Sequence, residues 1–142
     1  DNKHHLQMAY QNDNLLFSHA GISPEFLVDC KHDSGNIVDT VNDLWNYKPL
    51  IFNFADTGWG HSDPYGDDTY QTPIWIRPKS LMKACKNTSL KQDYIQIVGH
   101  TKVRKIDIKG HATGGRYYFI DCLDTSGEYL LYENKQIKIN KL

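Results

Sequence analysis

The sequence has no excess of charge of either sign, no long apolar run and few cysteines. Its 142 residues include 16 basic and 17 acidic ones, so it lacks the basic surface expected of a nucleic-acid-binding protein. No apolar stretch approaches the roughly 20 residues that a membrane-spanning helix needs. The three cysteines are an odd number without metal-binding spacing, which indicates free thiols in a reducing compartment. We therefore expect a cytoplasmic protein.

The chain also opens without a methionine and without a signal peptide, since its first residues are polar. We expect that it starts inside a longer protein or has been trimmed. A length of 142 residues suits one domain with a sizeable core, and no internal repeat or low-complexity tract divides it.

The first half of the sequence predicts one buried strand followed by helices. Leu15 to Ser18 form a short apolar strand, and Ser23 before Pro24 is a helix start. Apolar residues spaced for a helix follow from Ile37 to Trp45, with Ser34 as the predicted cap. Another helix is predicted over residues 80–86, entered through Pro78, whereas residues 50–55 fit either a helical turn or a strand.

From Tyr94 onward the sequence consists of short β-rich runs separated by glycines and turn residues. The segment "ENKQ" near Asn134 predicts a tight turn. We expect an α/β (α+β) fold in which helices come first and a largely antiparallel sheet follows. Between the two parts, residues 55–73 are rich in Gly, Pro and Asp and predict a long surface loop of the kind that often borders a site.

Two of the seven histidines end apolar strands and are the candidate site residues. His19 closes "NLLFSHAG" and His100 closes "IQIVGH", and small or hydroxyl residues follow each. Ligands bind at the carboxyl ends of strands in α/β proteins, and imidazole suits zinc, iron and manganese ions. The alternative is that each is a core histidine with satisfied hydrogen bonds. The histidines at positions 4, 5 and 32 are expected to be solvated, and those at positions 61 and 111, although either could border a site, are expected not to.

Three short motifs, "SHAGISPEF", "PIWIRP" and "VGHT", follow one another in an order that resembles the calcineurin-like metallophosphoesterases. The similarity is greatest to the bacterial branch related to the serine/threonine protein phosphatases. The resemblance implies that His19 and His100 ligate one ion of a two-metal centre. It also implies that Arg77 is catalytic and binds the substrate phosphate, which a guanidinium does well through paired hydrogen bonds.

The resemblance covers only part of such an enzyme. The family's amino-terminal motifs, which carry aspartates, an asparagine and a further histidine, do not occur here. Residues 1–142 would then be the carboxyl-terminal half of a single metallophosphoesterase domain, which is a four-layer sandwich. We expect weak or no metal binding by this fragment and negligible activity, although the intact enzyme would hold two divalent ions (Mn, Fe or Zn). A dimer through the surface left by the missing half is also expected.

The function predicted on this basis is metal-dependent hydrolysis of phosphate monoesters on a phosphorylated protein or small molecule. One alternative is a relative of the diadenosine polyphosphate hydrolases, in which rings of the 55–73 loop would stack on a base. Another is a non-catalytic interaction module with a vestigial half-site. No nucleic-acid or membrane partner is expected.

Overall fold

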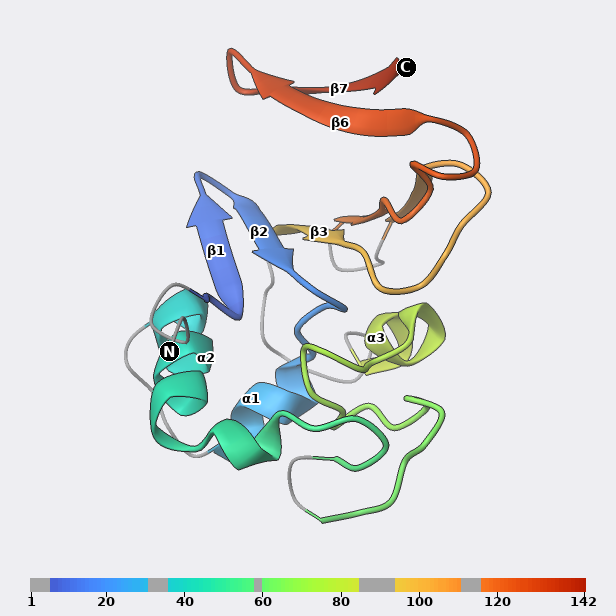
Figure 1. Cartoon of the computed structure of the whole chain (residues 1–142). Coiled ribbons are helices and arrows are strands. Elements are labelled where there is room, and N and C mark those ends of the chain that lie inside the picture. Colours follow the sequence, from blue (N-terminus) through green and yellow to red (C-terminus); the bar gives the residue numbers. More distant parts are fainter. Residues whose placement is uncertain (1–5, 31–35, 58–59, 85–93, 111–115) are drawn as a thin grey trace.

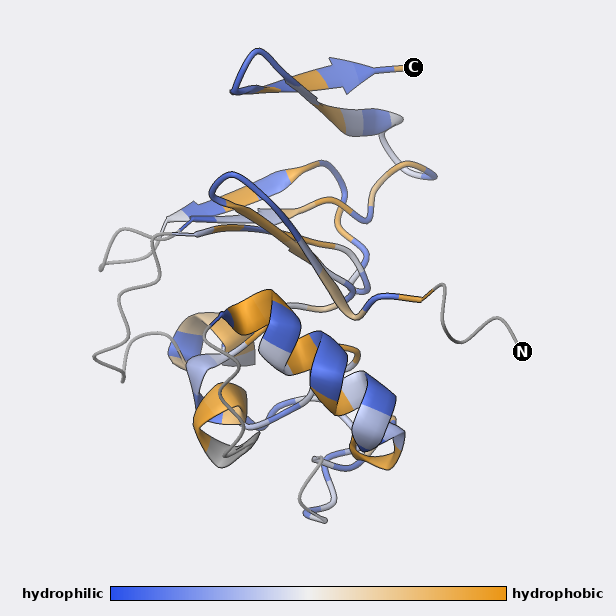
Figure 2. Cartoon of the chain, turned by 90° about the vertical axis from the view of Figure 1, so that its left-hand side faces the viewer, coloured by the Kyte–Doolittle hydropathy of each residue, from blue (hydrophilic) through white to orange (hydrophobic). Residues whose placement is uncertain are grey.

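The computed structural model describes residues 6–30, 36–57, 60–84, 94–110 and 116–142. They form three layers, in which helices lie on one side of a five-stranded sheet and a β-hairpin lies on the other (Figures 1 and 2). No helix in these ranges is long and apolar enough to cross a membrane. In chain order the elements are β1 Ala9–Asn12, β2 Leu15–Ser18, α1 Pro24–Cys30, α2 Ile37–Tyr47, the 3-10 helix η2 Pro49–Ile51, α3 Pro78–Ala84, β3 Ile95–Val98, β4 Asp107–Gly110, β5 Arg116–Phe119, β6 Glu128–Glu133 and β7 Gln136–Lys141.

The five-stranded sheet has the order β1-β2-β3-β5-β4. The central strands β2, β3 and β5 are parallel, and β1 and β4 pair antiparallel at the two edges. The predicted strand Leu15–Ser18 is confirmed, and the mixed α/β class is correct. The expectation of a largely antiparallel second half is wrong for this sheet, because the chain crosses over from β2 to β3 through the helices and so brings β3 in parallel. Hairpin-like glycine spacing gives no information about such a crossover.

The helices begin where short polar side chains can cap them. The amide of Phe26 donates to Ser23 Oγ at 3.1 Å, which confirms the predicted start of α1. Helix α2 is capped by Asn36, whose side-chain oxygen accepts from the amide of Asp39 at 2.8 Å. The predicted cap, Ser34, is therefore wrong, and it lies outside the described residues. Asn36 is the capping type nearest to the first apolar residue.

The helices pack on one face of the sheet through an apolar core. Its fully buried centre includes Leu16, Phe26 and Val41. One polar side chain, Gln96, lies inside this layer and bonds both main-chain groups of Ile22, donating to its oxygen and accepting from its amide, each at 2.9 Å. The strand that carries His100 is thereby fastened to the segment that follows His19.

The opposite face of the sheet is covered by the β6–β7 hairpin. Leu130 and Ile137 pack against a cluster that includes Ile97 and Tyr118. The hairpin turns at Asn134 and Lys135, which both have positive φ angles, so the predicted tight turn is confirmed. The sequence of residues 50–55 fitted either a helical turn or a strand. The structure shows a helical turn, since the segment begins with the end of η2.

Candidate functional site

The two predicted histidines meet at one edge of the sheet. Strands β2 and β3 are parallel and in register, with Ser18 paired to Val98, so the residues just beyond them emerge side by side. His19 Nε2 lies 2.9 Å from His100 Nδ1, and the two rings are 4.8 Å apart in an edge-to-face arrangement. The structure therefore brings together two imidazoles that are 81 residues apart in the sequence.

Close backbone approach at this edge depends on glycine. Gly21 has a φ of +114°, and a Cβ there would lie 2.3 Å from Leu81 Cδ2. The amide of Gly99 donates to the main-chain oxygen of His19 at 3.0 Å. His100 itself has a φ of +63°, a left-handed conformation that costs free energy for a residue with a side chain. Strain of this kind is common at functional sites.

His100 is uncharged at neutral pH. Burial lowers its pKa, and the neighbouring charges of His19 and Arg77 lower it further, against an opposing effect of Asp121, to about 4. Its Nε2 atom is buried and has no hydrogen-bond partner among the described residues. A neutral ring with Nδ1 directed at His19 has a lone pair available either for a hydrogen bond or for a ligand.

Arg77, the third predicted site residue, lies in the same cluster. Its Nε donates to the main-chain oxygen of Tyr65 at 3.2 Å, and Nη1 lies 3.4 Å from Thr101 Oγ1. Thr101 directly follows His100, so Arg77 is tied to the segment that carries the imidazole. The main-chain amide of Arg77 donates to Gly66 at 3.0 Å, which fixes the start of α3 against the 55–73 loop.

Trp75 connects Arg77 to His100, a role that sequence reasoning did not assign. The guanidinium carbon of Arg77 lies 4.9 Å from the centre of the indole, which is within range for a cation–π interaction. The imidazole of His100 lies 5.1 Å from the same indole, centre to centre. The motif "PIWIRP" was a usable signal, since it places this tryptophan two residues before Arg77.

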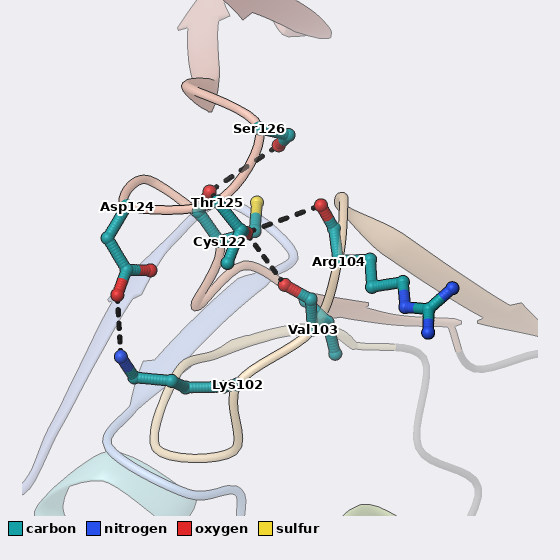
Figure 3. A network of polar contacts seen from close by, with 7 residues as sticks. All are labelled: Lys102, Val103, Arg104, Cys122, Asp124, Thr125 and Ser126. Atoms are coloured by element: carbon teal, nitrogen blue, oxygen red, sulfur yellow. Dashed lines mark hydrogen bonds and ion pairs between the residues drawn. The ribbon is translucent and has the colours of Figure 1, made fainter.

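The segment after His100 is braced by the turn that follows β5 (Figure 3). Thr125 Oγ1 donates to the main-chain oxygen of Val103 at 3.0 Å and also lies close to that of Arg104. Lys102 pairs with Asp124 on the surface. This network holds the loop that leaves the site, while exposed pairs of this kind add little stability themselves.

A groove of about 290 Å³ runs along the sheet face to His19. It is lined mainly by apolar side chains, and Tyr10 on its rim is 55% exposed. The lining residues are Gln7, Met8, Ala9, Tyr10, Phe17, Ser18, His19, Ile97, Gly99 and Ile120. An apolar surface therefore borders the imidazole pair on the side of the hairpin.

The described part of the chain contains no group of three or more His, Cys, Asp or Glu side chains suited to a metal ion. Among the described residues, the cluster therefore offers two imidazoles and no further such side chain. Cys122 is fully buried and so lacks the exposure that a nucleophilic thiol needs. His61 is exposed. The predictions for the histidines at positions 4, 5, 32 and 111 lie outside the described residues.

Comparison with known proteins finds similarity in structure alone. No family model and no curated protein sequence matches the chain. A point mutant of a cold-active protein tyrosine phosphatase matches 94% of this chain with a TM-score of 0.57 and 18% identity. The cold-active protein-tyrosine phosphatase of a psychrophilic Shewanella species matches the same share with a TM-score of 0.54 and 19% identity. In both cases the chain spans 40% of the neighbour's length.

These findings correct the family prediction. The solved structures that share the fold are described as protein tyrosine phosphatases, and no family model supports the calcineurin-like metallophosphoesterases. By this comparison the assignment to that family is wrong, and so is the prediction that the chain is half of a metallophosphoesterase sandwich. The physical reason is that strand-end histidines and glycine turns suit any ligand site at a parallel sheet edge, so short motifs do not identify a family.

Proposed function

We propose that this chain carries part of the site of a phosphatase that hydrolyses phosphate monoesters. The observation that supports this most directly is the single cluster formed by the His19–His100 pair and Arg77. It combines one permanent positive charge with two imidazoles at a sheet edge. The shared fold of the tyrosine phosphatases, which are longer than this chain, agrees with such a role.

Arg77 would bind the phosphoryl oxygens. A guanidinium offers two parallel N–H groups to a phosphate and stabilises the charge that develops as the ester bond breaks. The Arg77 side chain is already held by its hydrogen bond to Tyr65 and by its contact with the Trp75 ring. Little side-chain entropy is therefore lost when phosphate binds. The phosphate would then lie beside Thr101 and the imidazole pair.

The imidazole pair also fits two ligands of one divalent ion. His19 Nε2 and His100 Nδ1 lie 2.9 Å apart and would be the two nitrogens that hold it. The lowered pKa of His100 keeps its ring in the neutral form that a metal requires. A bound Mn, Fe or Zn ion would polarise a phosphoryl oxygen and acidify a coordinated water.

Two protein ligands are fewer than a catalytic metal site usually has, which is three. The remaining ligands, and those of any second ion, would have to come from outside the described residues. We therefore propose weak metal binding by this chain and negligible hydrolysis without further polypeptide. Isothermal titration with Mn²⁺ and Zn²⁺ tests this, with His19→Ala as the loss-of-binding variant and His61→Ala as the control. Tight binding that survives His19→Ala would contradict the proposal.

The phosphate site is tested by titrating inorganic phosphate into the ¹⁵N-labelled chain and following amide shifts. We expect saturable, millimolar binding that moves the signals of residues 75–77 and 99–101. Arg77→Gln should weaken binding at least about tenfold, as expected for loss of a charge-assisted contact. Arg104→Gln, at an exposed arginine beyond the site, should not. Equal loss in both variants would indicate unspecific attraction of the anion and would refute the site.

The substrate is proposed as a phosphorylated protein or a small phosphate ester. The neighbours are described as acting on protein tyrosine, whereas the motifs of the sequence favoured serine/threonine substrates. A non-catalytic module remains the second candidate, because the described residues supply only two imidazoles and one guanidinium. Phosphate binding by this chain, combined with no hydrolysis of phenyl phosphate by any longer protein that contains it, would favour that candidate.

A further inference from the structure

An aromatic pair adjoins Arg77 and extends the candidate site outward. The Phe54 and Trp75 rings are 5.2 Å apart, edge to face, and the Trp75 ring also contacts Arg77 and His100. Trp75 is therefore in contact with both the charged group and the imidazole of the candidate site. Phe54 continues this apolar surface away from the charge.

Phe54 is 62% exposed although large apolar side chains are usually buried. Its position is well defined by the backbone around it. Ala55 has a φ of +75°, which is strained for alanine, and its main-chain oxygen accepts from the amide of Asp63 at 2.7 Å. The amide of Asp56 donates to Asn53 Oδ1 at 3.2 Å. The fold thus holds an apolar ring in water, in contact with the indole that Arg77 lies over.

Tyr65 is a further exposed aromatic residue, hydrogen-bonded to Arg77 through its main chain. Its main-chain oxygen accepts from Arg77 Nε, which places the residue next to the guanidinium, and its side chain is 74% exposed. Flat apolar surfaces next to a phosphate-binding cation suit an ester whose phosphate is attached directly to an aromatic ring. Aromatic rings prefer centre-to-centre distances of 4.5–7 Å, which the spacing of Phe54 and Trp75 already shows.

We propose that Phe54 and Trp75 form an aryl-binding platform that makes the site selective for phosphate esters of aromatic alcohols. The platform rests on the proposed phosphatase function, because it places the aromatic group beside a phosphate held by Arg77. Phe54 is the specificity-determining residue of the pair, since it contacts the leaving group but not the phosphate. Trp75 has a second task, which is to position Arg77 and His100.

Binding of three probes tests the platform: phenyl phosphate, glycerol 2-phosphate and inorganic phosphate, each titrated into the ¹⁵N-labelled chain. We expect phenyl phosphate to bind about three- to tenfold more tightly than glycerol 2-phosphate, as one aromatic contact would provide. The indole N–H signal of Trp75, assigned through Trp75→Phe, should shift more with phenyl phosphate than with inorganic phosphate. These shifts report the platform without any need for turnover.

Phe54→Ala should abolish the preference for phenyl phosphate and leave the affinity for inorganic phosphate unchanged. The matched control is Tyr47→Ala, which removes another exposed ring at the end of α2, 79% exposed, and should change neither affinity. Equal binding of the two esters, with inorganic phosphate still bound through Arg77, would overturn the platform but not the proposed function. Absence of binding by all three probes would overturn both.

Discussion

A Cβ atom on Gly66 would lie 2.3 Å from the main-chain oxygen of Trp75 and 3.1 Å from Arg77 Cγ. The loop therefore packs directly beneath the two residues that carry the proposed phosphate and aryl contacts. Real Cβ atoms do not approach a main-chain oxygen so closely, so any side chain at position 66 must displace the Trp75 backbone.

Gly66→Ala should lower both stability and phosphate affinity. Its φ of +70° and the clash with Trp75 together should cost about 1–3 kcal/mol of unfolding free energy, measured by urea denaturation. Phosphate affinity should fall because Arg77 moves with Trp75. Gly60→Ala is the control: its φ of +87° is similarly strained, but the described part of the chain has no atom within 4 Å of the added Cβ. Equal effects of the two substitutions would show that backbone strain alone is responsible.

The stability of the protein should fall between pH 6.5 and 4 because of His100. An unfolded histidine titrates near 6.5, whereas burial, His19 and Arg77 lower the pKa of His100 to about 4. The unfolded state then binds a proton that the folded state excludes, so the contribution is complete above pH 6.5 and lost as the pH falls to 4. His100→Gln should flatten this part of the curve of unfolding free energy against pH.

The pKa of His100 should also respond to its neighbours, which NMR titration of the ring can measure. His19→Asn removes a charge that lowers it, so the value should rise towards 6.5, and Asp121→Asn should lower it. An unchanged value after His19→Asn would mean that burial alone accounts for the shift.

Arg77→Lys should not preserve phosphate binding. Lysine lacks the planar fork that can pair with two phosphate oxygens while donating to Tyr65, and it stacks less well on Trp75. We expect about a tenfold weaker affinity for inorganic phosphate with little change in stability. Arg104→Lys, at an exposed position, provides the control. Full affinity in Arg77→Lys would show that the site needs only a positive charge.

Gln96→Ala should be among the most destabilising single changes in the core. It leaves the amide and oxygen of Ile22 without their side-chain partner in a buried layer and also creates a cavity. These two losses predict about 2–4 kcal/mol in urea denaturation. Gln136→Ala, at the exposed start of β7, should cost less than about 0.5 kcal/mol. A small effect at Gln96 would imply that water replaces its amide.

The chain should self-associate through the apolar groove beside His19, with a second copy as the occupant. Tyr10 is exposed on the rim of this groove and stacks near Phe17, at 5.9 Å between ring centres. Light scattering over a concentration series should show a dimer, and Tyr10→Lys should shift the equilibrium to the monomer. Leu50→Lys, at an 88% exposed site on η2, is the control. A monomer at every concentration would contradict the expectation.

Local patterns predicted the elements well, but not how they are arranged. The strand Leu15–Ser18 and the starts of α1 and α2 follow from periodicity and capping chemistry, except that Asn36 replaces Ser34 as the cap. Strand β1 could not be predicted from its own residues. It is a strand because it pairs with β2, which supplies its hydrogen bonds. The parallel pairing of β2 with β3 depends on a crossover of many residues, and no short window of sequence records it.

For the candidate site, too, some residues could be predicted from the sequence and others could not. His19, His100 and Arg77 could be selected because each follows or precedes a strong local signal, although their roles stay predictions. Trp75 could have been selected from its place in "PIWIRP", whereas Phe54 could not, since exposed and buried aromatic rings look alike in a sequence. Their importance comes from contacts among Phe54, Trp75 and Arg77 that only the folded chain shows. The family could not be inferred from motifs of a few residues.

His19 and His100 follow strands β2 and β3, so no partly folded form that lacks the pairing of these strands can hold both rings in place. Any anion or ion that prefers the paired rings must therefore raise the free energy of unfolding as its concentration rises. The melting temperature of the chain therefore reports how much of the site is occupied by the ligand, even for a preparation that turns over no substrate.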